Sequence, residues 1–280
     1  MNLTSKKVLF IDLGEKTSEV KTFPGLYKYL GGLALGLRLY ELYQEQDPII
    51  FSVGPLNGFF PYASKTSAVF NAEGVIEDVC FGGYLSTRIK FADLDAVVIS
   101  GKADKPTIAD IQNESVSFIS DDAAPKSLGL PGKRSYLGVN DKQIIVDDYF
   151  TVSENILAQK FGKKKLLGIS VTGTCTYTVR DQDKYEALYR QLLARAKELK
   201  VEQGFFPSCA GCPMGCTKSN LAEVGGNVLV HSLVACGFAE SIYTDVGTVF
   251  SCLNILGYDY THEDIENLPV LVQNTLKNLD

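Results

Sequence analysis

The sequence predicts an α+β protein, in which a duplicated α+β domain over residues 1–178 precedes a smaller, mainly helical region over residues 179–280. Three observations lead to this prediction. An order of strand, helix and strand occurs twice near the N-terminus, short strands follow it, and the apolar residues change to a helical spacing near residue 178. With 280 residues, of which 45% are hydrophobic, the chain is long enough to bury the core of such a fold.

The repeated pattern occupies the first 110 residues. In the first copy, a strand and a turn lead to a helix and then to a second strand, in the stretches KKVLFIDLG, YLGGLALGLRLYELY and DPIIFSVGP. The second copy reads SAVFNAEG, CFGGYLSTRIKFADLD and AVVISGKA. Gly31-Gly32 in the first copy corresponds to Gly82-Gly83 in the second, and Gly54 to Gly101. A glycine pair at a helix start suits close packing or an anionic ligand, and packing is the simpler interpretation.

Short strands are expected next, and then helices. The strands are PTIADIQ, SVSFIS and KQIIVDDY, and SENILAQKFGKKKLLGISVTG predicts a third unit of helix and strand. Near residue 181, Asp181 or Asp183 is expected to cap a helix with one apolar face, formed by Tyr185, Leu188, Tyr189, Leu192, Ala196 and Leu199. Three further helical stretches follow the cysteines: HSLVACGFAESIYT, DVGTVFSCLNILG with Gly257 as its C-cap, and a last helix that the capping box THED opens.

Charge and composition exclude several classes of function. The chain has 27 Lys and Arg against 33 Asp and Glu, a net charge of −6, and its basic residues are scattered, so we expect no nucleic-acid partner. The N-terminal apolar stretch is short and interrupted by Asp12, so it predicts a strand and not a signal peptide, and no run is long enough to span a membrane. We therefore expect a cytoplasmic protein with reduced cysteines.

Three cysteines lie close together in the stretch PSCAGCPMGCTKSN. The spacing of Cys209, Cys212 and Cys216 places three thiols on one tight loop, where Gly211 and Gly215 allow backbone N–H groups to turn toward the sulfurs. Iron–sulfur clusters use such runs with a fourth cysteine from elsewhere, whereas zinc sites more often pair two Cys-x-x-Cys arms. An iron–sulfur cluster is therefore favoured over zinc, and cysteines without a ligand are the remaining alternative.

The fourth ligand is left open by the residues alone. Cys236 and Cys252 rank equally, with Cys80 and Cys175 as more remote candidates, and we assign Cys252 as the fourth metal ligand. A lone cysteine in an apolar helix, as at Cys252, is often only part of the core.

Several stretches together resemble the tungsten- or molybdenum-dependent aldehyde ferredoxin oxidoreductases. They are GPLNG, GGYLSTRIKFADLDAVVISGKADKP and CAGCPMGC, and the resemblance extends with gaps over nearly the whole chain. It implies a duplicated α+β domain that forms the base for a bis-pterin metal cofactor, with a [4Fe–4S] cluster beside it. Cys209, Cys212 and Cys216 match that family's cluster run, but its fourth cysteine lies in a C-terminal segment that has no match here.

The chain departs from the family pattern at the cofactor positions. Lys65 stands where the family has an arginine at the pterin phosphate, and Cys80 and Phe81 replace polar residues before Gly82 and Gly83. The stretch after the cysteines, VLVHS, has no carboxylate where the family has an acidic segment. By the resemblance, Lys65, Gly82 and Gly83 are the residues expected to bind a phosphate-bearing cofactor, and a tungsto- or molybdopterin is secondary to the [4Fe–4S] cluster.

These observations predict an iron–sulfur protein of oxidoreductase ancestry, in which we assign no catalytic residue. It would transfer electrons or serve as one subunit of a split aldehyde-oxidoreductase-like enzyme, and independent aldehyde oxidation is not expected. The expected partners are a second copy of the chain, another oxidoreductase subunit, or ferredoxin. The alternatives are a non-catalytic scaffold that has lost the pterin site, and an enzyme with altered cofactor chemistry in which His231 accepts a proton.

Overall fold

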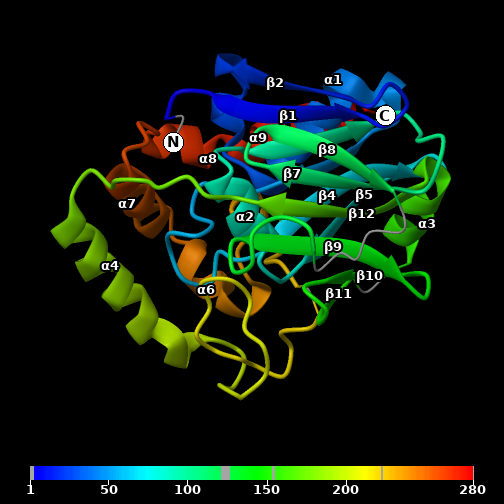
Figure 1. Ribbon diagram of the computed structural model, residues 1–280. Coiled ribbons are helices and arrows are strands. Elements are labelled where there is room, and N and C mark those ends of the chain that lie inside the picture. Colours follow the sequence, from blue (N-terminus) through cyan, green and yellow to red (C-terminus); the bar gives the residue numbers. More distant parts are fainter. Residues whose placement is uncertain (1–2, 121–126, 153–154, 222, 280) are drawn as a thin grey trace.

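Two six-stranded mixed sheets that share one hydrophobic core form the centre of the molecule (Figure 1). The structure is a computed structural model that describes residues 3–120, 127–152, 155–221 and 223–279. Helices cover the outer face of the first sheet and extend beyond it to the cysteine segment. The α+β class predicted from the sequence is confirmed.

The first sheet contains both copies of the predicted repeat. Its strand order is β2-β1-β6-β3-β4-β5, with β1 (Lys6–Asp12), β2 (Thr17–Phe23), β3 (Ile49–Ser52), β4 (Thr66–Ala72), β5 (Val75–Phe81) and β6 (Ala96–Ser100). In each copy a hairpin is followed by one helix, α1 (Gly32–Tyr43) or α2 (Leu85–Phe91), and by one strand. The two copies have the same order of elements but not the same strand directions. The last strand of the second copy, β6, is parallel to β1, whereas the last strand of the first copy, β3, is antiparallel to β4.

Two strands of this sheet were not expected. The stretch TSEVKTF, predicted as part of a turn, forms the edge strand β2, and its mostly exposed residues explain why it lacks an apolar alternation. Cys80 and Phe81, assigned to the start of a helix, instead end β5, which pairs antiparallel with β4. The position of Cys80 on a strand, two residues after Asp78, places both side chains on one face of the sheet.

The second sheet has the order β11-β10-β9-β12-β7-β8. Its strands are β7 (Thr107–Gln112), β8 (Ser115–Ser120), β9 (Arg134–Asn140), β10 (Gln143–Val146), β11 (Phe150–Thr151) and β12 (Leu166–Thr172). The helix α3 (Ile156–Lys164) precedes β12, which confirms the third unit of helix and strand. Residues 153 and 154 of that predicted stretch lie outside the described residues.

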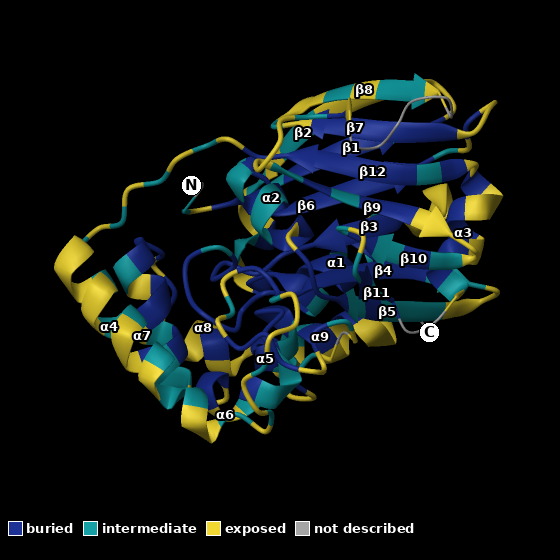
Figure 2. Ribbon diagram, turned by 60° about the horizontal axis from the view of Figure 1, so that its bottom comes forward, coloured by how far each residue is buried: buried dark blue, intermediate teal, exposed yellow. Residues whose placement is uncertain are grey.

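Alternation along the strands divides the core into two parts. On β1, Val8 and Phe10 face α1 and the C-terminal helices, whereas Leu9 and Ile11 face the second sheet together with α2 and α3. The inner strands of both sheets are accordingly buried along most of their length, and exposed residues concentrate on edge strands, helix surfaces and loops (Figure 2). The first sheet is therefore the common wall of both cores.

The helices after β12 have the caps that the sequence predicts. They are α4 (Gln182–Ala194), α5 (Val228–Ser232), α6 (Glu240–Tyr243), α7 (Val246–Leu256), α8 (His262–Glu266) and α9 (Leu268–Lys277), and the described 3₁₀ turns are Pro24–Tyr29, Gln44–Gln46, Arg195–Glu198 and Gly237–Ala239. Asp181 caps α4, Gly257 ends α7 with φ of 97°, and Thr261 opens α8 with a capping box. None of the described helices is long and apolar enough to cross a membrane.

One predicted helical stretch is broken. HSLVACGFAESIYT begins inside α5, which ends at residue 232, and the next α-helix, α6, begins at residue 240. Between them Val234 adopts a φ of 51°, a left-handed conformation that a β-branched residue rarely takes. This turn leads into a short extended segment that pairs with residues far away in the sequence.

Candidate functional site

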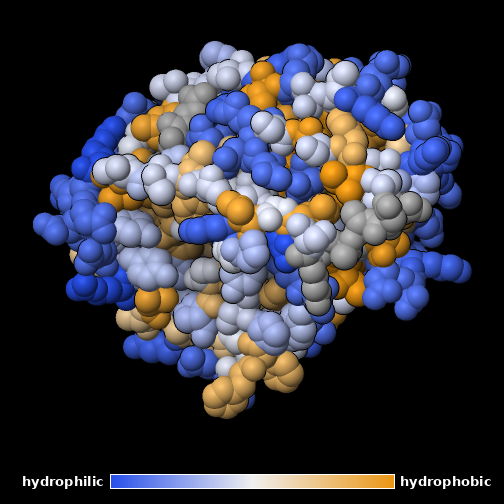
Figure 3. All heavy atoms as spheres, in the orientation of Figure 1, coloured by the Kyte–Doolittle hydropathy of each residue, from blue (hydrophilic) through white to orange (hydrophobic). Residues whose placement is uncertain are grey.

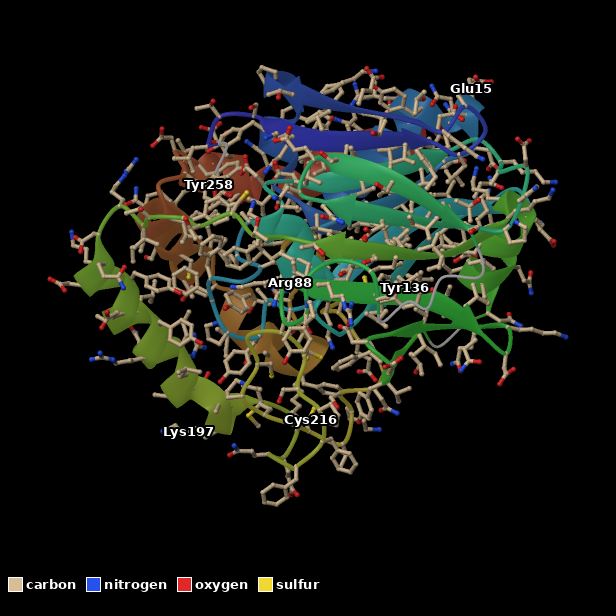
Figure 4. All side chains as sticks on the ribbon, in the orientation of Figure 1. Glu15, Arg88, Tyr136, Lys197, Cys216 and Tyr258 are labelled. Carbon is tan, nitrogen blue, oxygen red and sulfur yellow. The ribbon has the colours of Figure 1, made fainter. Side chains whose placement is uncertain are left out.

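The cysteine loop is closed by its own backbone. The N–H of Cys212 donates to the carbonyl of Cys209 at 3.0 Å, and the hydroxyl of Ser208 accepts from the N–H of Gly215 at 3.0 Å. Gly211 and Gly215 have φ of 70° and 47°, in the left-handed region that glycine enters without steric cost. These turns form the lower end of the molecule, where Figure 4 shows Cys216.

A fourth cysteine reaches this loop from the segment after α5. The N–H of Cys236 donates to the carbonyl of Tyr62 at 2.9 Å, and the N–H of Lys65 donates to the carbonyl of Val234 at 3.0 Å. Through these bonds the segment 234–236 lies beside residues 62–65, and an isolated bridge joins Val224 to Cys236 on its other side. The pairing fixes Cys236 between the start of β4 and the cysteine loop.

The four thiols line one cavity. Cys209, Cys212, Cys216 and Cys236 all line one small cavity with a volume of about 20 Å³. Cys209 and Cys216 are buried, and Cys212 and Cys236 are half-buried. Four thiols around one cavity match the donor set of an iron–sulfur cluster or of zinc.

Lys65 supplies a buried positive charge to this cavity. Its Nζ lies 3.2 Å from Sγ of Cys209, and the residue is only 2% exposed. Burial by itself would lower the pKa of Lys65, but the charges of Cys209 and Cys236 hold that pKa above its ordinary value. A lysine in this position offsets negative charge on thiolates.

Burial disfavours the thiolate form of two of these cysteines, Cys212 and Cys236. Burial raises the pKa of Cys212 to about 12 and also raises the pKa of Cys236. A bound metal centre would take these thiols as thiolates and release their protons. The cavity is therefore arranged for a ligand that compensates thiolate charge and not for a free reactive thiolate.

A buried hydroxyl without a partner supports a bound group in the cavity. Ser64 lines the same space and is 1% exposed, and its Oγ has no hydrogen-bond partner among the residues that the structure describes. A buried unsatisfied hydroxyl is costly, and a sulfur atom of a bound cluster would accept its hydrogen bond. The residues present thus fit an iron–sulfur cluster.

The sulfurs of the cysteine cavity are spaced more widely than the ligands of one bound ion. A tetrahedral zinc site with Zn–S bonds of about 2.3 Å holds its sulfurs about 3.8 Å apart. Among the described residues, Asp78, Cys80 and His231 form the one set of three potential metal ligands whose atoms all lie within 4.8 Å of one another, so no three of the four cysteines do. A cluster, in which each cysteine binds a different iron, requires the wider spacing.

The other predicted ligand does not reach the cavity. Cys252 lies on α7, is fully buried in the core that α7 shares with the first sheet, and does not line the cavity. Cys175 is half-buried elsewhere, with its N–H bound to the carbonyl of Phe91. Cys236 reaches the cavity because segment 234–236 pairs with residues 62–65, more than 160 residues away in the sequence. No local sequence pattern indicates this pairing.

The two glycines assigned to a cofactor phosphate pack against the cysteine loop. A Cβ on Gly82 would lie 2.8 Å from Sγ of Cys209, so this glycine lets the loop approach β5 closely. The carbonyl of Gly83 accepts from the N–H of Ala210 at 3.2 Å, and a Cβ on Gly83 would lie 2.8 Å from Val146. The direction in which a side chain would extend from each glycine is therefore already filled by packed atoms.

His231 lies outside the cysteine cavity. Its Nε2 is 2.5 Å from a carboxylate oxygen of Asp78 and 3.4 Å from Sγ of Cys80. The sequence singled out His231 and Cys80 separately, but it did not indicate that they meet.

Comparisons with known proteins agree with this fold. Residues 8–136 match the family model described as the aldehyde ferredoxin oxidoreductase N-terminal domain. The tungsten-containing aldehyde ferredoxin oxidoreductase of Pyrococcus abyssi is 27% identical over 237 residues, 72% of this chain and 38% of that protein. The enzyme of the same name from Thermococcus kodakarensis is 24% identical over 74% of this chain and 38% of its own length.

One solved structure matches nearly the whole chain in fold. It is the active site complex BamBC of benzoyl coenzyme A reductase with 1,5-dienoyl-CoA, with a TM-score of 0.64 and 14% identity over 98% of this chain and 63% of the other. The chain spans little more than a third of the length of the curated relatives that it matches. Residues 8–136 are thus similar to the aldehyde ferredoxin oxidoreductase N-terminal domain, and most of the chain is similar in sequence to the N-terminal part of tungsten-containing aldehyde ferredoxin oxidoreductases.

Proposed function

We propose that this protein binds an iron–sulfur cluster, most simply [4Fe–4S], through Cys209, Cys212, Cys216 and Cys236 and acts as an electron-transfer subunit of a larger oxidoreductase. The observation that supports this function best is the lining of one cavity by four thiols that come from two separate segments. Cys236 replaces Cys252 in the proposed ligand set, since Cys252 does not line that cavity.

The surrounding residues suit such a cluster. When bound, it would supply one-electron transfer. Lys65 would offset the negative charge of the thiolates, and Ser64 would donate its free hydrogen bond to a sulfur. The burial of Cys209 and Cys216 would limit the access of water, while the half-buried Cys212 would leave the cluster within reach of an electron partner.

A role as one subunit agrees with the surface around the cysteine loop. Phe205 and Phe206, which precede the loop, are 107% and 49% exposed. Apolar side chains project at the lower end of the molecule, the end to which the cysteine segment belongs (Figure 3). Exposed aromatic pairs are typical of protein interfaces, and this pair would bring a redox partner close to the cluster.

Independent aldehyde oxidation is not part of the proposal. Gly82 and Gly83, the glycines that the resemblance assigned to the cofactor, are covered by packed side chains and by the cysteine loop. Lys65, its third assigned residue, points to Cys209 instead of to an open phosphate site.

The test is the metal content of protein purified without oxygen, compared between two alanine variants. We expect about four irons and four sulfides per chain in the wild type, a large loss of both in Cys236→Ala, and no loss in Cys252→Ala. Cys252→Ala is the matched control because it removes an equally buried or more buried thiol from the core without touching the cavity.

Each other outcome is equally decisive. Iron that is lost in Cys252→Ala and kept in Cys236→Ala would overturn the ligand set. A colourless wild-type protein without iron would overturn the function and favour a scaffold that has kept the fold alone. Circular dichroism melts of both variants identify any loss of iron that results from unfolding.

A further inference from the structure

A second group of potential metal ligands lies outside the cysteine cavity. Nε2 of His231 is 2.5 Å from Oδ2 of Asp78 and 3.4 Å from Sγ of Cys80, and that sulfur is 3.9 Å from Oδ2 of Asp78. Among the described residues no other three potential ligand atoms come so close together. None of these residues has a role in the cluster site.

Two elements bring these side chains together. Asp78 and Cys80 are two residues apart on β5 and therefore lie on the same face of the sheet. His231 comes from α5, whose position is fixed by the pairing of the following segment 234–236 with residues 62–65. Ser67, opposite Cys80 on β4, donates its hydroxyl to the other carboxylate oxygen of Asp78 at 2.5 Å and so orients that carboxylate.

The geometry does not suit a nucleophilic triad. A Cys–His–Asp triad requires the thiol and the carboxylate on different ring nitrogens, so that the carboxylate orients the histidine. Here both the carboxylate and the thiol lie at Nε2 of His231. A simple ion pair with His231 would explain the contact of Asp78. It would not explain why Sγ of Cys80 lies at the same nitrogen atom.

The three atoms do suit one small ion. Tetrahedral coordination with bonds of about 2.0–2.3 Å separates ligand atoms by about 3.3–3.8 Å. Two of the three observed separations, 3.4 and 3.9 Å, are close to this range, and only the contact between His231 and Asp78 at 2.5 Å would have to lengthen. The side chains of His231 and Asp78 are 25% and 11% exposed, so a fourth position can be open to solvent.

We propose that Asp78, Cys80 and His231 bind a single divalent transition-metal ion, for which zinc is the best match, with the fourth position left for water or a small ligand. One thiolate, one carboxylate and one neutral imidazole balance the charge of a divalent ion, which allows the site to exist near the buried charge of Lys65. Mixed sulfur, nitrogen and oxygen donors are typical of zinc, and three protein ligands with one free position are typical of its reactive sites.

The experiment is a titration of the full-length protein with Co²⁺ as a spectroscopic substitute for zinc, without oxygen. His231→Gln is compared with His262→Gln, because the chain has only these two histidines and His262 is exposed on α8. We expect His231→Gln to remove one tightly bound Co²⁺ per chain, or to weaken its binding at least about tenfold, and His262→Gln to remove none. The test compares the number of Co²⁺ ions bound per chain in the two variants. Cobalt bound in the cysteine cavity would contribute equally to both and does not affect the comparison.

A second pair of variants tests the thiol ligand. Cys80→Ser should lower the intensity of the thiolate-to-cobalt charge-transfer band, whereas Cys175→Ser, at a half-buried cysteine outside both sites, should not. Equal cobalt counts in both histidine variants, or an unchanged band in Cys80→Ser, would overturn the proposal. The iron content of His231→Gln should equal that of the wild type, which separates this site from the cluster.

Discussion

At the scale of single residues, Lys65 is the most informative side chain of the site. It is buried against Sγ of Cys209, and the resemblance assigned it instead to a phosphate. The residue type was thus a correct signal for a negatively charged ligand, but the sequence did not show which ligand. A buried cation favours the more reduced, more negative state of a neighbouring redox centre.

We therefore predict that Lys65→Met lowers the midpoint potential of the proposed cluster. A charge about 5 Å away at an effective dielectric constant of about 20 contributes about 3 kcal/mol, which corresponds to a shift on the order of 100 mV. Potentiometric titration followed by electron paramagnetic resonance measures this shift. Lys218→Met is the matched control, since Lys218 lines the same cavity but is exposed, and solvent should reduce its shift to a small fraction. Equal shifts in both variants would contradict the assigned role of Lys65.

At the scale of elements, the sequence predicted the helix caps but not the break in the helical stretch after α5. The ends of α4, α7 and α8 depend on residues within one turn of each terminus, so the sequence indicated them correctly. The break after α5 depends on Val234, whose left-handed conformation no local pattern favours. That conformation persists because Val234 and Cys236 are held by backbone bonds to Lys65 and Tyr62.

The start of α7 gives a prediction about stability. Oδ2 of Asp245 accepts from the N–H of Thr248 at 2.9 Å and from its hydroxyl at 2.6 Å. We expect Asp245→Ala to lower the free energy of unfolding at pH 7 by about 1 kcal/mol, and Asp245→Asn, which still caps, to lower it much less. Urea unfolding of the three proteins measures both differences.

The same residue gives that prediction a dependence on pH. The hydrogen bonds from Thr248 lower the pKa of Asp245 in the folded state. Its ionised form therefore stabilises the protein above the unfolded pKa of about 4, and this contribution is lost as the pH falls through the folded pKa. Below pH 5 the free energy of unfolding of the wild type should therefore fall relative to that of Asp245→Asn. A difference in free energy of unfolding that does not change with pH would contradict this prediction.

At the scale of the whole molecule, one buried lysine near the N-terminus contacts aromatic residues near the C-terminus. Lys6 on β1 donates its Nζ to the carbonyl of Leu30 at 2.6 Å and lies 5.7–5.9 Å from the rings of Tyr27, Tyr258 and Tyr260. Figure 4 shows Tyr258 near the C-terminal helices, beside the first sheet. The aromatic side chains thus enclose a cation that belongs to the first strand.

This arrangement predicts how stability changes in alkaline solution. Burial lowers the pKa of Lys6 to about 8, so between pH 8 and its unfolded value of 10.5 the unfolded chain binds more protons. The contribution of Lys6 to the free energy of unfolding therefore rises as the pH increases from 8 to 10.5. Relative to Lys6→Met, the wild type should gain roughly 1–3 kcal/mol between pH 7 and pH 10. Unfolding curves of both proteins at the two pH values measure this gain, and parallel pH dependences would refute it.

The sequence by itself determined the α+β class, the repeated order of elements, the helix caps and the three-cysteine loop, because each depends on residues close together in the chain. Only the tertiary structure decided which distant residues complete the sites. The pairing of segment 234–236 with residues 62–65 brings Cys236 to the cysteine loop and His231 to Asp78 and Cys80. Such pairing depends on backbone hydrogen bonds and on the packing of whole layers, and these leave no periodic pattern in the sequence.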